Sequence, residues 1–191
     1  MRSTVSVFLI SLLCVFNAGG QKDKMFKGLK QTLAVPADSV YRLDLSKSKL
    51  TEIPKEIYQF KNLRELNLSK NKLTDLPTDF IFSDLRILDI SRNKLTVFPL
   101  AVCQNTSIRN LFMGKNQINK IPDCIGNMEN LIVLDIWFNP IEDLPISMTK
   151  LRNLRSLDLS GISFNKTQQQ QWTEMLHWVK IKFEAACDCN N

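Results

Sequence analysis

Aliphatic residues recur between positions 40 and 164 with a period of 22 or 23 residues. The first position of each unit is aliphatic: Val40, Leu63, Leu85, Ile108, Leu131 and Leu154. The fourth position is always leucine: Leu43, Leu66, Leu88, Leu111, Leu134 and Leu157. The sixth is aliphatic or methionine: Leu45, Leu68, Ile90, Met113, Ile136 and Leu159. Side chains alternate across a strand, so positions four and six face the same side. Each of these six repeats therefore predicts one short strand with an apolar inner face.

Two further positions complete the repeat. Position nine is asparagine in the four inner repeats: Asn71, Asn93, Asn116 and Asn139. Position fifteen is proline in five: Pro54, Pro77, Pro99, Pro122 and Pro145. We expect the asparagine amide to turn inward, where it both donates to and accepts from backbone groups of neighbouring coils. One repeat cannot bury its own apolar face but a stack of repeats can, so the pattern predicts a solenoid.

This frame resembles that of the leucine-rich repeat family over residues 40 to about 164, in the 23-residue form with "DLP", "KIP" or a similar triplet. The resemblance implies an α/β fold: a right-handed solenoid whose parallel β-sheet lines a concave face. Small secreted bacterial proteins of this family resemble this chain at the C-terminal end, where they have a helix, a short strand and a Cys-x-Cys tail. The family resemblance favours protein binding over catalysis.

The two ends of the stack are expected to carry helical caps. Residues 21–39 form the N-terminal cap, where an amphipathic helix is predicted from the spacing of Met25, Phe26, Leu29 and Leu33. The six repeats cover 40–164. Residues 165–191 form the C-terminal cap, in which a helix buries Trp172, Met175, Leu176 and Val179 and a short strand follows at 180–183.

The first twenty residues have a different pattern. Arg2 precedes an apolar run, Val5 to Phe16, and the small residues Ala18 and Gly20 follow it. As a helix this run would be about 18 Å long, shorter than the roughly 30 Å core of a bilayer. We expect a signal peptide at 1–20 and a mature chain without an integral membrane segment that is secreted, periplasmic or at the cell surface. The alternative is a buried N-terminal helix.

Four cysteines follow this segment: Cys103, Cys124, Cys187 and Cys189. Export permits disulfides but does not require them. Cys103 and Cys124 lie at different positions of adjacent repeats, so a bond between them is one option. A bond within the terminal "CDC" would be strained, which leaves an intermolecular bond or free thiols open for that pair.

Composition excludes more functions than it suggests. The net charge of +6 is modest and dispersed, so we expect no nucleic-acid partner. The chain has one histidine and six glycines, which leaves little material for a Cys-His nucleophile, a metal centre or a phosphate-binding loop. We therefore expect no enzymatic activity, no cofactor and no metal.

The outward strand positions three, five and seven indicate where a partner binds. They are polar in the first two repeats, but repeats three to five carry apolar residues there. We predict a protein-binding patch on the concave face: Ile87, Asp89, Phe112, Val133, Asp135, Trp137 and Phe138. Apolar patches of this kind mark interaction sites, and Trp is frequent among binding hot spots. The structural alternative is that Trp137 lies flat over the sheet and Phe138 tucks under the C-terminal flank.

A column of basic residues runs beside this patch, at positions eight and ten. We call it the basic ladder: Lys47, Lys70, Arg92, Lys115, Lys49, Lys72 and Lys94. It is either a docking site for an acidic protein or surface glycan, or a solvated rim. Together with the aromatic patch it gives the alternative function of carbohydrate or envelope-polymer binding. Self-association through the solenoid ends or the cysteine tail is a third hypothesis.

Overall fold

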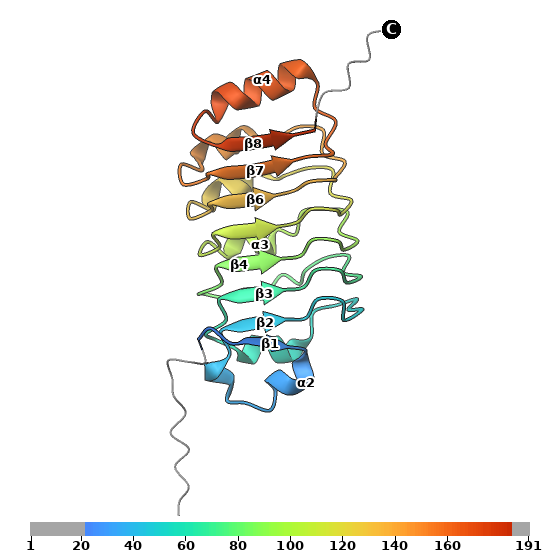
Figure 1. The fold of residues 1–191 in the computed structure, drawn as a ribbon, viewed down its shortest axis with the longest axis vertical. Coiled ribbons are helices and arrows are strands. Elements are labelled where there is room, and N and C mark those ends of the chain that lie inside the picture. Colours follow the sequence, from blue (N-terminus) through green and yellow to red (C-terminus); the bar gives the residue numbers. More distant parts are fainter. Residues whose placement is uncertain (1–21, 185–191) are drawn as a thin grey trace, which may run out of the picture.

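The computed structural model describes residues 22–184. The expected signal peptide at 1–20 and the tail cysteines Cys187 and Cys189 lie outside these residues. The described chain forms one eight-stranded sheet in which every strand is parallel to its neighbours and the strands follow sequence order (Figure 1). The strands are β1 (Met25–Lys27), β2 (Arg42–Asp44), β3 (Glu65–Asn67), β4 (Ile87–Asp89), β5 (Asn110–Phe112), β6 (Val133–Asp135), β7 (Ser156–Leu159) and β8 (Lys180–Phe183).

The register of the sheet follows the repeat. The leucines of position four lie opposite one another, from Leu43 and Leu66 on β2 and β3 to Leu134 and Leu157 on β6 and β7. All six of these leucines are fully buried. Burial of each such side chain contributes roughly 1.5–3 kcal/mol, and each does so only because the next coil covers it. The solenoid and its parallel sheet are confirmed.

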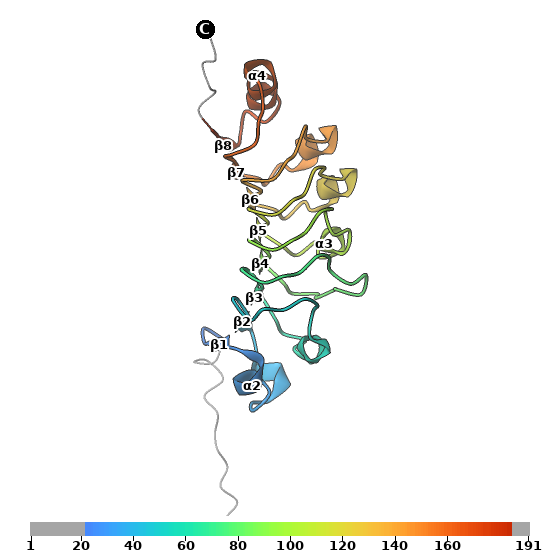
Figure 2. The ribbon, with the colours of Figure 1, turned by 90° about the vertical axis from the view of Figure 1, so that its right-hand side faces the viewer.

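Short helices form the other side of the stack. They are the 3₁₀ helices η1 (Ala37–Ser39), η2 (Lys55–Gln59), η3 (Asp123–Asn127) and η4 (Ile146–Lys150), with the single α-helical turn α3 (Ala101–Gln104). A proline precedes each of the four 3₁₀ helices in an extended conformation. The stack curves gently, with the strands along its concave side and the helices on its convex side (Figure 2).

The asparagines of position nine behave as predicted. The Nδ2 of Asn71 donates to the carbonyls of Leu45 and Leu68, at 2.9 and 2.8 Å, and its Oδ1 accepts from the Leu50 N–H at 3.0 Å. Asn93, Asn116 and Asn139 make equivalent bonds to the repeat before them. These buried amides satisfy backbone groups that the turn would otherwise leave unpaired.

The prediction for the N-terminal cap is wrong in its first half. Met25, which was expected to begin a helix, begins strand β1, and a single helical turn, α2 (Leu29–Thr32), follows. Phe26 is 3% exposed and lies opposite Leu43, so it occupies the inward column of the sheet. A strand covers the edge of the first repeat and satisfies its backbone groups, which a helix would leave unpaired. Gly28, with φ of 75°, ends the strand.

The C-terminal cap contains the expected helix and strand. Helix α4 (Lys166–Met175) begins at a capping box, in which the Asn165 side chain accepts from the Gln168 N–H at 2.9 Å. Trp172 is buried beneath the helix. The strand predicted at 180–183 is β8, which pairs with β7 and closes the sheet (Figure 1).

A disulfide joins Cys103 of α3 to Cys124 of η3, so one of the two options left open by the sequence is realised. It links two adjacent repeats on the convex side. Within residues 22–184, no helix is long and apolar enough to cross a membrane.

Candidate functional site

The outward residues of positions three and five form two rows across the concave face. The register places Ile87, Asn110 and Val133 side by side in one row, and Asp89, Phe112 and Asp135 in the other. All six are half-buried, so they face the solvent side of the sheet without being sealed in the coil. The structure therefore brings together the strand residues predicted for the binding patch.

Trp137 is half-buried and folds back over the preceding repeat. A Cβ atom on Gly114 would collide with Nε1 and Cδ1 of the indole, so the ring rests on the space that a side chain at Gly114 would fill. The guanidinium carbon of Arg92 lies 5.2 Å from the centroid of the indole. Position seven is therefore more enclosed than the sequence suggests, since Ser69 and Gly114 are both buried.

Phe138 adopts a left-handed backbone, with φ of 49°. The residues at the same position of repeats one to four, Lys47, Lys70, Arg92 and Lys115, have φ between 55° and 58°, and repeat six has Gly161 with φ of 73°. This conformation costs about 1–2 kcal/mol for a residue with a Cβ. The position-eight residues of the basic ladder therefore lie in a turn that requires a left-handed backbone. The side chains of the ladder are exposed.

The Phe138 ring lies against Gly161 of the next repeat, where an added Cβ would collide with it. It nevertheless remains 54% exposed, and its centroid lies 5.4 Å from that of Trp137 in an edge-to-face arrangement. We call the five apolar residues Ile87, Phe112, Val133, Trp137 and Phe138 the central patch. Gly114 and Gly161 are the residues that sequence reasoning missed: each replaces a Ser or a basic residue beside the one aromatic repeat.

The carboxylates and amide of position five have a local structural role. Asp44, Asn67, Asp89 and Asp158 each accept a hydrogen bond through Oδ1 from the backbone N–H two residues later, at 2.8–2.9 Å. These bonds close the turn at the end of each strand. Asp89, a predicted partner-binding residue, is therefore also part of the scaffold.

Asp135 departs from this arrangement. Its Oδ1 is buried without a hydrogen-bond partner. Burial, and after it the charge of Asp158, raises the pKa of Asp135 to about 6, although a hydrogen bond from the Trp137 backbone N–H partly offsets both. Burial also acts on Asp158, but hydrogen bonds from Ser160 and Lys182 bring the pKa of Asp158 below its ordinary value.

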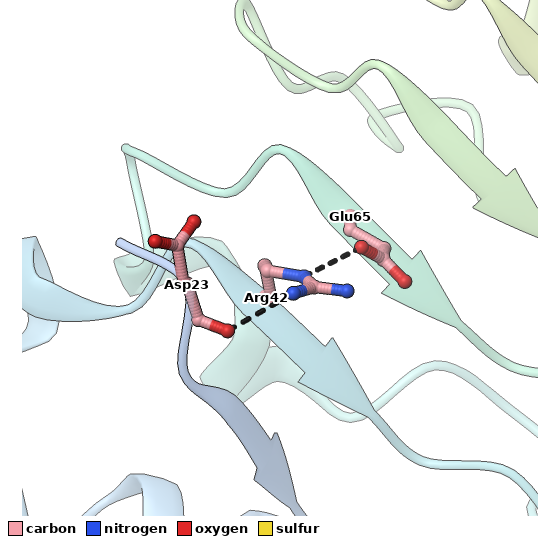
Figure 3. A network of polar contacts seen from close by, with 3 residues as sticks. All are labelled: Asp23, Arg42 and Glu65. Atoms are coloured by element: carbon pink, nitrogen blue, oxygen red, sulfur yellow. Dashed lines mark hydrogen bonds and ion pairs between the residues drawn. The ribbon is translucent and has the colours of Figure 1, made fainter. Parts of the chain in front are cut away.

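Both ends of the concave face hold ion pairs. At the N-terminal end, Arg42 Nε donates to Glu65 Oε2 at 2.7 Å and Arg42 Nη1 donates to the Asp23 carbonyl at 2.9 Å (Figure 3). At the C-terminal end, Lys182 Nζ lies 3.2 Å from Asp158 Oδ2. Asp89 and Asp135, in the middle, have no ion-pair partner among the residues that the structure describes.

A repeat solenoid with an open concave sheet and one aromatic repeat defines the class of the protein. The sequence model described as "Leucine rich repeat" matches residues 38–95 and 61–118. A search of curated proteins gave no match. Among solved structures, a leucine-rich repeat protein of Leptospira interrogans is similar, with a TM-score of 0.69 and 26% identity. The match covers 85% of this chain and 47% of that protein, so the chain spans about half the length of its structural relative.

Residues 38–118 therefore match the leucine-rich repeat family, and the fold of residues 22–184 is similar to that of a leucine-rich repeat protein. The fold is that of a protein-interaction module, and proteins of this family are generally recognition modules without enzymatic activity. Within residues 22–184, no group of three or more His, Cys, Asp or Glu side chains is arranged to hold a metal ion.

Proposed function

We propose that the protein is an exported recognition module that binds another protein through the central patch of its concave face. The observation that carries the proposal is the pair Trp137 and Phe138. The Phe138 ring is 54% exposed on a left-handed backbone that other repeats give to a basic residue or glycine. Every repeat has this backbone at position eight, so a partner would explain the exposed aromatic ring and not the backbone cost of about 1–2 kcal/mol.

The neighbouring strands extend the surface that a partner would meet. Ile87, Phe112 and Val133 lie on three consecutive strands and contribute half-buried apolar side chains. Large aromatic residues surrounded by polar positions are typical of binding hot spots.

Two observations support export. The first is the apolar run before residue 20, which has the composition of a signal peptide. The second is the disulfide between Cys103 and Cys124, a bond that persists mainly in oxidising compartments. Processing is tested by N-terminal sequencing of the protein recovered from the cell surface or medium. A protein that is recovered only inside the cell with its first residues intact would contradict export.

Affinity capture tests the binding site. The immobilised protein is compared with the double variant Phe112→Ala/Trp137→Ala, and circular dichroism verifies that the variant is folded. The control is Ile81→Ala/Leu100→Ala, two exposed apolar residues of the same chain outside the central patch, 53% and 64% exposed. We expect the control to retain the captured protein and the Phe112/Trp137 variant to lose it. Equal capture by both variants would exclude the concave patch.

The basic ladder favours a second candidate, binding of an anionic glycan. Its members are exposed and recur on successive coils, about 4.8 Å apart at the strand ends. Titration with heparin followed by Trp fluorescence tests it. A salt-sensitive change that is lost in Lys70→Ala/Lys115→Ala would favour the glycan, and no change would favour the protein partner.

A further inference from the structure

We propose that the protein partner inserts an arginine or lysine side chain over Phe112, between the carboxylates of Asp89 and Asp135. This inference rests on the proposed function, and it specifies the chemistry of the group that occupies the centre of the concave face. The occupant is a side chain of a protein segment, and other ligands are outcomes of the test below.

The geometry comes from the sheet register. Asp89, Phe112 and Asp135 are direct partners on β4, β5 and β6. Adjacent strands lie about 4.8 Å apart, so the two carboxylates flank the aromatic ring across about 10 Å. A cation above the ring interacts with its face and with both carboxylates, and an arginine can donate to two acceptors at once. Ile87 and Val133, in the neighbouring row, contact the apolar stem of a long cationic side chain.

The rest of the concave face shows what its carboxylates bind. Glu65 is paired with Arg42, and Asp158 is paired with Lys182. Asp44 lies directly opposite Lys27 in the register of β1 and β2. The protein's own cations therefore stand beside the acids at both ends of the face. In the middle, where the apolar residues lie, Asp89 and Asp135 have no such cation within residues 22–184.

Asp135 is the carboxylate that would gain most from a cation. Its Oδ1 is buried beside Gly114 and the Trp137 indole without a hydrogen-bond partner, so a cation over Phe112 would act on this carboxylate through its charge and not through direct contact with Oδ1. The groups that face it are Asp89 on β4, Asp158 on β7, Lys182 on β8 and the Trp137 N–H, and the two aspartates oppose its ionisation. A bound cation would stabilise the charged form, so binding should strengthen as the pH rises through about 6.

The surroundings restrict where the cation can sit and what accompanies it. The Trp137 indole already carries the Arg92 guanidinium at 5.2 Å, whereas no cation within residues 22–184 lies over the Phe112 ring. The basic ladder lies along the edge of the same sheet and repels a uniformly basic partner. The partner segment should therefore have one central cation with acidic residues toward the ladder.

Peptide libraries randomised around one fixed central residue test the proposal. Four libraries carry arginine, lysine, citrulline or glutamate at that place, and citrulline is the neutral isostere of arginine. The full protein is compared with Asp89→Asn/Asp135→Asn, and Asp44→Asn is the matched control at the same strand position. We expect binders from the arginine and lysine libraries, with affinity reduced at least about tenfold in the double variant and unchanged in the control.

The outcomes separate this inference from the proposed function. Equal binding from the citrulline library, better binding from the glutamate library, or equal affinity of the Asp89/Asp135 variant would each overturn the cation proposal. Failure to obtain any binder would overturn it too. If capture of the natural partner is lost in Phe112→Ala/Trp137→Ala but kept in Asp89→Asn/Asp135→Asn, the concave site stands and the cation does not.

Discussion

Trp137 and Phe138 are each matched to a glycine in a neighbouring repeat. The indole rests over Gly114, one repeat earlier, and the phenyl ring rests against Gly161, one repeat later. The other residues at these positions are serines or basic residues, whose side chains would fill the same space. The two aromatic side chains therefore need a glycine in the preceding repeat and another in the following repeat. The aromatic repeat thus constrains the sequence of both neighbouring coils.

Gly114→Ala tests this dependence. The new methyl group would collide with the indole, so we expect Trp137 to be displaced and the free energy of unfolding to fall by about 1–3 kcal/mol. Urea unfolding and Trp fluorescence measure both effects. Ser91→Ala, at the same position of the previous repeat, is the control and should leave the emission spectrum unchanged. A Gly114→Ala variant with the wild-type spectrum and stability would contradict this placement.

Asp135→Asn tests the charge at the centre of the face. Burial raises the pKa of Asp135 to about 6 from 3.8, so the folded chain holds this proton more tightly than the unfolded chain. Stability should therefore fall as the pH rises from about 4 to about 6 and stay level above that. The neutral variant avoids the loss and should be more stable at pH 7, by about 1 kcal/mol after allowance for solvent screening.

Thermal unfolding at pH 4 and pH 7 measures this gain, which should vanish at the lower pH. Asp44→Asn, at the same position of repeat one, is the control without a comparable gain. A variant less stable than the wild type at pH 7 would show that Asp135 is already compensated. If the gain appears while partner binding weakens, Asp135 trades stability for recognition.

At the scale of elements, each strand is three or four residues long and is stable only within the stack. The position-nine asparagines tie consecutive turns together, and the capping box of α4 fixes the last coil. Strand β1 shows the same principle at the other end. The apolar spacing of Met25, Phe26, Leu29 and Leu33 suits a helix, but the open edge of β2 supplies backbone partners that only a strand can use.

Asn116→Ala tests the asparagine column. Its Oδ1 accepts from the N–H groups of Asn93 and Leu95 at 3.1 and 3.2 Å, and its Nδ2 donates to the carbonyls of Ile90 and Met113 at 3.1 and 2.8 Å. Removing the amide leaves these backbone groups unpaired, and we expect a loss of about 2–4 kcal/mol in chemical denaturation. The exposed Asn119→Ala should change stability by less than about 0.5 kcal/mol. Similar losses in both variants would argue against the column.

At the scale of the whole molecule, each coil contacts mainly its neighbours, so stability is close to a sum of repeat and interface contributions. Such a stack can unfold from one end while the rest stays folded. The disulfide between Cys103 and Cys124 joins two inner repeats on the convex side, while the proposed binding surface lies on the concave side. The convex face thus holds the covalent link between repeats, and the concave face holds the proposed recognition surface.

Cys103→Ser/Cys124→Ser tests the reinforcement. The bond closes a segment with a sequence separation of 21 residues, for which the chain-entropy estimate is about 3 kcal/mol. We expect the urea midpoint to fall and the transition to broaden as the two halves of the stack uncouple. Reductant should destabilise the wild type in the same way and leave the double variant unchanged. Equal stability of the oxidised and reduced wild type would contradict the prediction.

The sequence by itself determined the six repeats, the inward leucines and the asparagine column, because each depends on a side-chain period that is visible along the chain. The parallel sheet was implied by the resemblance of that period to leucine-rich repeats. Only the tertiary structure decided that β1 replaces a helix, that Cys103 pairs with Cys124, and that Trp137 and Phe138 lie over Gly114 and Gly161. Those features arise between residues of different coils, where space and unpaired groups depend on the neighbouring repeat. The strand positions of Asp89 and Asp135, in the middle of the concave face, were predictable. Only the structure showed that neither carboxylate forms an ion pair within residues 22–184, whereas Glu65 and Asp158 toward the two ends do.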